Sequence, residues 1–547
     1  MKVRIEKYLK ELVALDSISG TAKEVGPAKY IYSFLERIEY FNKNKDKFEY
    51  YQIEGDPFNR AVVYGFLEGN KKDTVVMMGH MDVVSAEPYG KLQDKAFTLG
   101  KDLEDEIAKL PLDDIQREHM ESGEWIWGRG AADMKGGVAI HMALFEDYAK
   151  MAELGTLEGS IMFMAVPDEE SYSVGMRNGV KILKDFKEKF GLNYKLLIDP
   201  EPANVVDGKQ IMSIGSVGKT MPVVMVQGVP AHIGYCFNGM TALGILTGIY
   251  NKTNGSLDFS DIYEDEATVP PSWTNLRDMK EIYDVSTPMR ASGYFTVLSF
   301  DKTPTEMMEQ LKDISTKVFV REVEKWNNTY QEFKKRNKFE TKEKLHYDPY
   351  VVTFEELVEK LKTEQGDSFN SFYKEKYQYV KAQIESGNFN YPEGTQYMMK
   401  EVLNFANISV PVVLLAFAPP YYSPVHSDRI EGKEGYGSAA YKFVSEYSKE
   451  KFDQDMSYEN YFMGISDASY SAICSDFDYE RFAKDTPLWG ELYSIDFEAM
   501  ESIAIPAVIY GPMGLQYHQW SERVHKKSLF EIVPDTTREL IKYMWRI

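Results

Sequence analysis

Cysteine is scarce in this chain of 547 residues, which contains only Cys236 and Cys474. Two cysteines are too few for a disulfide framework, so we expect two buried, free thiols in a reducing compartment. Long apolar runs are also missing, and the longest, at 410–418, is much too short to span a bilayer. Near the N-terminus, charged residues alternate with apolar ones, unlike the unbroken apolar core of a signal peptide. These absences predict a cytoplasmic protein.

Positive charge is in short supply as well. The chain has 63 Lys and Arg against 85 Asp and Glu, which gives a net charge of −22. A field of this sign repels the phosphates of nucleic acids and of anionic lipids, so we expect neither nucleic acid nor membrane as a partner. Apolar residues make up 44% of the chain and aromatic residues 14%, enough for the cores of at least two domains.

Short apolar runs and helical stretches alternate in the first part of the chain. The runs lie at 61–66, 74–78, 160–166 and 195–198, and helical patterns at 138–151 and 174–190 separate the last three. Such alternation is typical of an α/β fold in which a mostly parallel sheet is flanked by helices on both faces.

The pattern changes after Gly218. Strands are predicted over 221–226 and 292–300, helices over 240–250 and 305–335, and a closing strand over 350–354. Apolar runs at 408–417 and 505–510 then resume the buried-strand pattern of the first part. We therefore expect one α/β domain made of residues 1–217 and 354–547, interrupted by a smaller α+β domain over residues 218–353.

Residues 215–220, Gly-Ser-Val-Gly-Lys-Thr, match the end of a phosphate-binding loop. The first glycine of that motif is missing, because position 213 is Ser. A β-like run also follows Thr220 in place of the helix whose N-terminus receives the phosphate. The segment predicts a turn between domains, not a nucleotide site.

Imidazole and carboxylate side chains cluster where the predicted strands end. Each motif alone is also typical of a hydrogen-bonded turn or a solvated acidic loop, but the carboxyl ends of parallel strands meet in one crevice. Ligands of these two kinds without cysteine suit Zn²⁺, with Mn²⁺ or Co²⁺ as alternatives. The side chains are His80, Asp82, Asp133, Glu169, Glu170, Asp199, Glu201 and His518.

This ordered set, with the glycine-rich segment 128–137 around Asp133, resembles a family of co-catalytic zinc peptidases and amidohydrolases. Its members include glutamate carboxypeptidase, aminoacylase, acetylornithine deacetylase and succinyl-diaminopimelate desuccinylase. The resemblance implies a zinc-exopeptidase-like fold with an inserted lid domain and two Zn²⁺ per chain. It also allows a homodimer formed through the lid domain.

The resemblance implies a role for each ligand. His80 binds one metal, Asp133 bridges both, and Glu170 binds the other, while Asp199 and His518 complete the two sites. Many relatives place a Glu-Pro where this chain has Asp-Pro-Glu-Pro at 199–202, so Glu201 is an alternative to Asp199. We favour Asp199 because it directly follows the apolar strand.

The resemblance also implies three catalytic residues. Glu169 corresponds to the general base, Asp82 to the residue that orients His80, and His232 to a lid histidine that helps to bind the substrate carbonyl. The peptide bond after the bridging acid is cis in relatives, so a cis bond is expected between Asp133 and Met134.

We expect a metal-dependent hydrolase that cleaves an amide or peptide bond of a small amino-acid derivative or short peptide, with Glu169 taking the proton of the attacking water. One rival is a dipeptidase or carboxypeptidase as opposed to a deacylase, and another is a non-catalytic binding protein on the same fold. The family's Asp-x-Arg segment, whose arginine holds a substrate carboxylate, is not recognisable. Arg290 is only a weak substitute for it.

Overall fold

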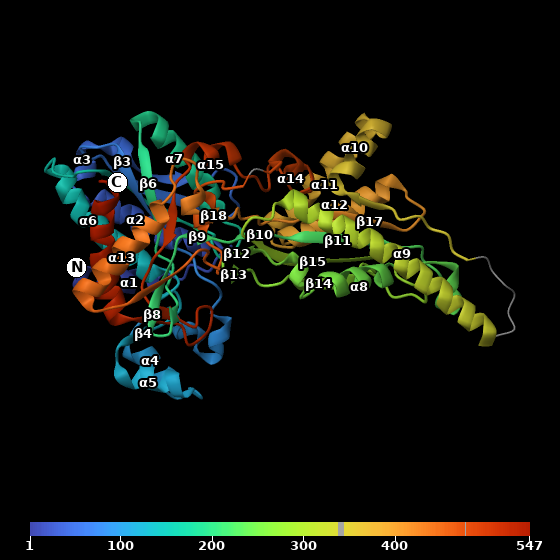
Figure 1. Cartoon of the computed structure of the whole chain (residues 1–547), viewed down its shortest axis with the longest axis horizontal. Coiled ribbons are helices and arrows are strands. Elements are labelled where there is room, and N and C mark those ends of the chain that lie inside the picture. Colours follow the sequence, from blue (N-terminus) through green and yellow to red (C-terminus); the bar gives the residue numbers. More distant parts are fainter. Residues whose placement is uncertain (337–343, 476) are drawn as a thin grey trace. The chain divides into compact units, whose positions relative to one another are not determined.

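The computed structural model describes residues 1–336, 344–475 and 477–547. They form two compact units. Figure 1 shows the chain coloured along the sequence, with many of its elements labelled. None of the helices in these ranges is long and apolar enough to cross a bilayer. The first unit comprises Met1–Val217, Tyr422–Cys474 and Asp496–Ile547, and the second comprises Gly218–Tyr421 and Ser475–Ile495.

Within the described residues, the first unit is built on a nine-stranded sheet. Its order is β1-β2-β5-β3-β6-β20-β8-β19, and β7 pairs with β8. The four central strands β5, β3, β6 and β20 are mutually parallel, which confirms the expected mostly parallel sheet. The strands are β1 Phe48–Gln52, β2 Ala61–Leu67, β3 Asp73–His80, β5 Ser160–Val166, β6 Asn193–Asp199, β7 Val205–Val206, β8 Lys209–Ser213, β19 Met456–Glu459 and β20 Ala507–Ile509.

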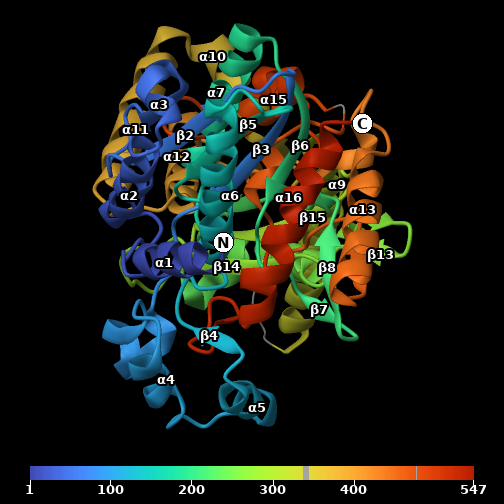
Figure 2. The same ribbon diagram turned by 90° about the vertical axis from the view of Figure 1, so that its left-hand side faces the viewer.

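Helices cover both faces of this sheet. Phe163 of β5 joins the core that includes α6, whereas its neighbour Met164 points to the other face, where its sulfur lies beside Gly179 of α7. Figure 2 shows α6, α16 and α13 side by side on the first of these faces. The helices are α1 Lys2–Val13, α2 Val25–Glu36, α3 Tyr40–Lys43, α4 Lys101–Ile107, α5 Asp114–Ser122, α6 Lys135–Glu153, α7 Val174–Phe190, α13 Tyr436–Phe452, α15 Phe497–Ile503 and α16 Val533–Met544.

Two small sheets complete the first unit. The strand pair β9 (Gly215–Ser216) and β18 (Val425–His426) is antiparallel. A three-stranded sheet has the order β21-β22-β4, with bounds Gly514–Leu515, Arg523–His525 and Trp125–Trp127. This second sheet supports the loop between β21 and β22, which carries His518.

The second unit is an α+β unit with its own sheet. The order is β10-β15-β11-β17-β16, with β14 paired to β15. Side chains of β11 and β17 form a core with α10 and α12. The strands are β10 Gly218–Thr220, β11 Pro222–Gln227, β12 Ile262–Tyr263, β13 Glu266–Ala267, β14 Ser272–Asp278, β15 Arg290–Ser299, β16 Val351–Thr353 and β17 Val412–Phe417; the helices are α8 Ala242–Thr253, α9 Pro304–Arg336, α10 Phe354–Gln365, α11 Asp367–Glu385, α12 Tyr391–Ala406 and α14 Tyr479–Lys484.

The second unit starts at Gly218, where the sequence pattern changes, but it extends to Tyr421 instead of ending at 353. The difference lies in β17, whose apolar run was expected to return to the first sheet. It pairs with β11 instead, antiparallel over its whole length. A run of buried strand residues does not specify its partner, because the pairing is non-local.

Two smaller expectations concern residues away from the sheets' centres. Cys236 and Cys474 are not joined in a disulfide bond, and both are half-buried where full burial was expected. Residues 215–220 form β9 and β10, and the chain continues into strand β11. With no helix N-terminus after Thr220, this segment lacks the part of a phosphate-binding loop that holds the phosphate.

Candidate metal centre

His80 is the last residue of β3, and its side chain is fully buried. The Nδ1 atom lies 3.0 Å from the main-chain oxygen of Asp82 and 3.5 Å from its carboxylate. With Nδ1 donating to these oxygens, Nε2 of a neutral imidazole carries a lone pair. The structure thus gives Asp82 the contact that its expected orienting role requires.

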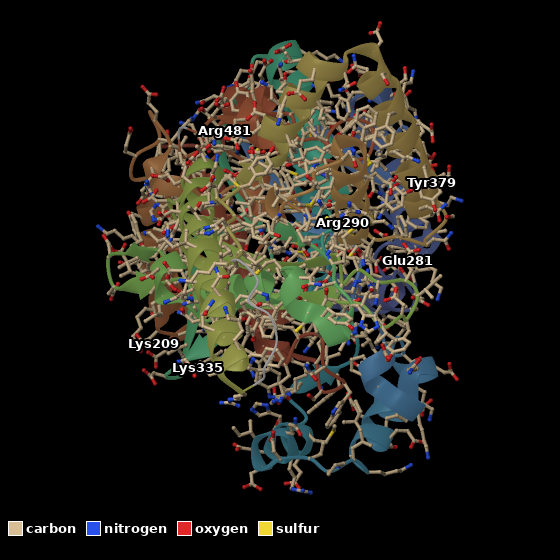
Figure 3. All side chains as sticks on the ribbon, turned by 90° about the vertical axis from the view of Figure 1, so that its right-hand side faces the viewer. Lys209, Glu281, Arg290, Lys335, Tyr379 and Arg481 are labelled. Carbon is tan, nitrogen blue, oxygen red and sulfur yellow. The ribbon has the colours of Figure 1, made fainter. Side chains whose placement is uncertain are left out.

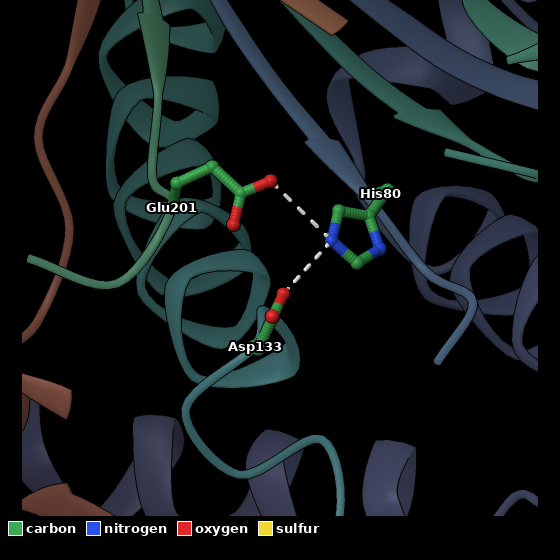
Figure 4. Close-up of side chains that lie close together, drawn as sticks. All are labelled: His80, Asp133 and Glu201. Atoms are coloured by element: carbon green, nitrogen blue, oxygen red, sulfur yellow. Dashed lines mark hydrogen bonds and ion pairs between the residues drawn. The ribbon is translucent and has the colours of Figure 1, made fainter. Parts of the chain in front are cut away.

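The Nε2 atom of His80 faces two carboxylates. It lies 3.2 Å from Oδ1 of Asp133 and 3.4 Å from Oε1 of Glu201. The dashed lines in Figure 4 mark these two contacts. Burial lowers the pKa of His80, but Glu201 and Asp133 raise it by more, to well above its usual value. A lone pair between two carboxylates is repulsive, so the site requires either a proton on Nε2 or a metal ion.

His518 forms the second half of the cluster. It lies in the loop between β21 and β22 with φ at +63°, and its side chain is 49% exposed. Its Nε2 atom is 3.2 Å from Oδ2 of Asp133 and 3.2 Å from Oε2 of Glu170. The two oxygens of Asp133 therefore face different histidines, which is the arrangement of a carboxylate that bridges two ions.

Glu201, which the sequence kept as the alternative to Asp199, is the carboxylate that lies beside His80. The Asp199 carboxylate lies at the end of β6, where Oδ2 accepts a hydrogen bond of 2.5 Å from Ser466 Oγ. Glu201 lies two residues beyond the strand, and its longer side chain reaches His80. The contacts of the structure therefore favour Glu201 over Asp199 as the carboxylate beside His80.

Glu169 is close to this cluster but outside the closest contacts. Its Oε2 atom is 3.9 Å from Nε2 of His80. The amides of Glu169 and Glu170 donate to Oδ1 and Oδ2 of Asp82, at 3.2 and 3.1 Å. Asp82 thus holds both the imidazole and the turn that carries the two glutamates, a second contact that the sequence motif did not indicate.

Asp168, the neighbouring acid, is occupied in building the same turn. Its Oδ1 atom accepts a hydrogen bond from Arg60, and its Oδ2 atom accepts one from the amide of Val174 at 3.1 Å. Its main-chain oxygen also accepts the amide of Ser173, and its φ is +73°. These contacts leave Asp168 fixed behind Glu169, where it shapes the turn.

The carboxylates of the cluster are short of positive charge. Burial, and then the charge of Asp133, raise the pKa values of Glu170 and Glu201 above their usual value. Within the ranges that the structure describes, Oε1 of Glu170 is buried without a hydrogen-bond partner. A buried carboxylate either takes up a proton or is compensated by a cation, and a bound metal would supply that cation to this site.

The spacing of the donor atoms fits a metal as well. Two ligand atoms about 2.0–2.1 Å from a tetrahedral Zn²⁺ lie about 3.3–3.4 Å apart. The separations here between Nε2 and carboxylate oxygens are 3.2–3.4 Å. Two triads have this geometry and share one residue; they are His80, Asp133 and Glu201, and Asp133, Glu170 and His518.

Glu522 supports the bridging acid, although the sequence gave it no role. It is fully buried, its Oε2 atom pairs with Arg129, and its Oε1 atom accepts the amides of Ala132 and Asp133 at 3.2 and 3.3 Å. The peptide bond between Asp133 and Met134 is cis, as expected. For Glu522, the only signal in the sequence was that an acid follows shortly after His518.

Two predicted residues belong to the second unit. His232 is exposed, and its Nδ1 atom accepts the amide of Gly234 at 3.1 Å. Arg290, labelled in Figure 3, donates to side-chain oxygens of Gln227 and Asn404 within its own unit. These contacts give Arg290 a packing role, while the expected role of His232 at the substrate carbonyl stays a prediction.

Comparison with known proteins places this site in a family. A family model described as peptidase family M20/M25/M40 matches residues 76–541. The chain is 27% identical to Protein RocB of Bacillus subtilis over 547 residues, which covers 97% of this chain and 93% of RocB. It is 37% identical to a succinyl-diaminopimelate desuccinylase of Rhodopseudomonas palustris over 110 residues, which covers 20% of this chain and 27% of that protein.

A solved structure shares the fold. A tripeptidase from Staphylococcus aureus superposes with a TM-score of 0.52 and 13% identity, covering 100% of this chain and 99% of the tripeptidase. Because the family model matches residues 76–541, most of the chain, this chain belongs to peptidase family M20/M25/M40.

Proposed function

We propose that this chain is a hydrolase with two divalent ions, most suitably Zn²⁺, that cleaves an amide or peptide bond in a small amino-acid derivative or short peptide. Membership of the peptidase family supports hydrolysis. The observation that carries the proposal is the placement of Asp133, whose two oxygens each lie 3.2 Å from a different histidine. Sequence alone could not have given this opposed geometry.

The two triads that share Asp133 would hold the ions. When bound, such a pair polarises a scissile carbonyl and lowers the pKa of water. Mn²⁺ and Co²⁺ also accept imidazole and carboxylate ligands and stay alternatives. The ligands come from β3, the turn before α6, the turn after β5, the residues after β6 and the β21–β22 loop, so the fold of the first unit assembles the site.

Glu169 acts as the general base in this proposal. Burial, and then the nearby carboxylates of Glu201 and Glu170, raise its pKa well above the usual value, so it can hold a proton during a reaction cycle. Asp82 fixes its position through the main-chain amide. Glu169 takes the proton of the attacking water and delivers it to the nitrogen of the leaving group.

His232 contributes from the second unit in this proposal, by donating a hydrogen bond to the substrate carbonyl oxygen as negative charge develops. His232→Ala should keep the metal content, lower kcat strongly and change KM less. Mixing His232→Ala with Glu169→Gln protein tests for a homodimer formed through this unit. Partial recovery of activity means that the histidine acts on the partner's site, and no recovery despite subunit exchange means that it acts within one chain.

Two readings compete with this proposal. A non-catalytic binding protein would not need Asp82 to hold Glu169 beside the candidate metal ligands. A dipeptidase or carboxypeptidase differs from a deacylase only in the groups around the scissile bond. The deciding experiment measures metal content and hydrolysis of a panel of dipeptides and N-acyl amino acids, with and without a chelator; activity that a chelator abolishes and added metal restores is expected.

Glu169→Gln is the sharpest variant for this test. It should retain both ions and lose about 10³- to 10⁴-fold in kcat, because the base is gone while the ligands remain. Glu188→Gln, an exposed change on α7, serves as the matched control and should behave as the wild type. Near-normal turnover of Glu169→Gln refutes the assigned base.

A further inference from the structure

Arg129 is a buried arginine in the segment between β4 and α6, shortly before the bridging acid Asp133. Its Nη1 atom pairs with the carboxylate of Glu522. Its Nη2 atom donates to the main-chain oxygen of His518 at 3.0 Å and to that of Ser85 at 3.2 Å. A charged side chain from the segment of the bridging acid therefore holds the main chain of a metal ligand that comes from a distant loop.

Glu522 makes the reciprocal connection. It follows His518 in the chain, and its Oε1 atom accepts the amides of Ala132 and Asp133. Its main-chain oxygen also accepts the amide of Gly128 at 3.2 Å. Each segment thus contributes a charged side chain that holds the main chain of the other segment at a metal ligand, and these two side chains pair with each other.

Both side chains of this ion pair are withdrawn from water. The exposed fraction is 1% for Arg129 and 0% for Glu522. A buried ion pair adds little net stability to a fold, because the cost of desolvating the charges offsets their attraction. The guanidinium is nevertheless strongly directional, since it presents its donors in a rigid planar fork. The pair is therefore better suited to fixing one arrangement of two segments than to stabilising the fold.

His518 lacks the support that the other histidine of the site has. Asp82 accepts hydrogen bonds from the far nitrogen of His80, whereas no hydrogen bond to Nδ1 of His518 occurs within the described residues. The hydrogen bond from Arg129 to the main-chain oxygen of His518 is therefore a contact that limits where the imidazole can lie. It leaves rotation of the ring to the ion.

We propose that Arg129 is a positioning residue for the metal ligand His518, and that with Glu522 it fixes the separation between His518 and the bridging Asp133. The inference rests on the proposed two-ion function, because it concerns the ion held by Asp133, Glu170 and His518. It goes beyond the ligands by naming what places one of them. Residues that support a metal ligand contribute about 10- to 100-fold to metal affinity.

Arg129→Lys separates positioning from charge. An ammonium group keeps the buried carboxylate of Glu522 compensated, but it lacks the planar fork that reaches Glu522 and His518 together. Calorimetric titration of metal-free protein with Zn²⁺ should show two ions in the wild type. In the variant, one ion should bind about 10- to 100-fold more weakly and the other should change by less than about 3-fold. Unchanged affinity for both ions overturns the proposal.

Arg290→Lys is the matched control. It makes the same substitution at a buried arginine of the second unit, whose guanidinium donates to Gln227 and Asn404. This variant should bind both ions as the wild type does. An equal loss of affinity in Arg290→Lys and Arg129→Lys would mean that any buried arginine has this effect, and it overturns the proposal.

A double-mutant cycle with His518→Ala distinguishes positioning from general structural damage. If Arg129 acts through the imidazole, Arg129→Lys should weaken the affinity for the weaker ion by less than about 3-fold in protein that already carries His518→Ala, because no imidazole remains to be positioned. A structural defect lowers the affinity equally in both backgrounds. Equal losses therefore overturn the proposal.

A second variant covers the case in which Arg129→Lys does not fold. Arg129→Met combined with Glu522→Gln removes both charges, and the oxygen of the glutamine can still accept the amides of Ala132 and Asp133. Because no unpaired charge is left buried, Tm should stay within a few degrees of the wild type. The affinity for one ion should still fall by about 10-fold or more. Wild-type affinity for both ions overturns the proposal.

Hydrogen exchange of chelator-treated protein tests the positioning without metal or turnover. The amides of residues 515–522 should exchange about 10-fold faster in Arg129→Lys than in the wild type, and no faster in Arg290→Lys. If the wild type binds fewer than two ions, the proposed function fails, while faster exchange still supports the positioning of this loop. Unchanged exchange overturns the inference, whatever metal binding and the substrate panel show.

Discussion

The two histidines of the metal centre have the same ligand chemistry but different surroundings. His80 is fully buried on a central strand, and Asp82 accepts hydrogen bonds from its far nitrogen. His518 has a 49% exposed side chain on a loop, and no hydrogen bond to its Nδ1 occurs within the described residues. The sheet holds His80 in place in advance, whereas the position of His518 would depend more on a bound ion.

This difference predicts which half of the site binds its ion more tightly and which half exchanges its ion faster. A ligand held by a second residue loses less freedom when the metal binds, so the half built on His80 should retain its ion more tightly. The half built on His518 borders solvent and should exchange its ion faster. The predictions below either abolish this asymmetry or measure it.

Asp133→Ala should disrupt both halves of the site at once, because both halves share Asp133. The variant should lose both ions and about 10⁴-fold or more of kcat. Metal analysis after gel filtration, alongside circular dichroism to check folding, measures the effect. Full occupancy of both ions in a folded variant contradicts the bridging role.

Glu201→Gln should affect only the half built on His80. Loss of this ligand should weaken one ion's affinity by about 100-fold, since a partner behind a ligand alone costs about 10- to 100-fold. Asp199→Asn is its matched control, with an expected loss of less than about 10-fold because Asp199 binds Ser466. A larger effect of Asp199→Asn would return the ligand role to Asp199.

Asp82→Asn should reduce the asymmetry without removing a ligand. The main-chain oxygen of residue 82 still accepts from Nδ1, but the negative charge that makes the imidazole a stronger ligand is lost, so the affinity of the His80 half should fall by about 10-fold. Stopped-flow release of metal to a chelator should show two phases in the wild type that approach each other in the variant. If the two phases stay equally far apart in the variant, Asp82 is not the cause of the difference between the two halves.

The pH dependence of the metal-free protein gives the smallest effect. Hydrogen bonds to Asp133 and Glu170 raise the pKa of His518 to about 10, above its ordinary value of about 6.5. Its contribution to stability is therefore complete below about pH 6.5 and is lost as the pH rises through about 10. The raised pKa values of Glu170 and Glu201 act in the same direction.

Differential scanning fluorimetry should accordingly show Tm of chelator-treated protein falling by a few degrees between pH 6.5 and pH 10. The metal-loaded protein should lack this decline, because the ions replace the protons. His518→Gln should flatten part of it. A Tm that rises with pH in the metal-free wild type would contradict the assigned charge balance.

The sequence predicted the mostly parallel sheet of the first unit, and its motifs named the imidazole and carboxylate residues that the structure brings together around Asp133, because both depend on local patterns. Strand ends and their polar residues can be read from apolar runs, and the ordered motif supplied the ligand roles. The choice between Asp199 and Glu201 could not be made in this way. It depends on Ser466, which is far away in sequence and binds one of the two candidates.

The remaining parts of the fold could not be predicted from local patterns, because they depend on contacts between residues far apart in the sequence. The run that became β17 has the composition of any buried strand, and only its partner β11 places it in the second unit. Glu522 was visible as an acid but had no local signal of its role. Its importance comes from Arg129, with which it pairs.

Anomalous X-ray scattering at the metal's absorption edge, from crystals of metal-loaded protein, tests the central claim most directly. The account predicts two peaks that both border Asp133, one between His80 and Glu201 and the other between His518 and Glu170. A single peak, or a peak coordinated by Asp199 in place of Glu201, would contradict the two-ion centre described above.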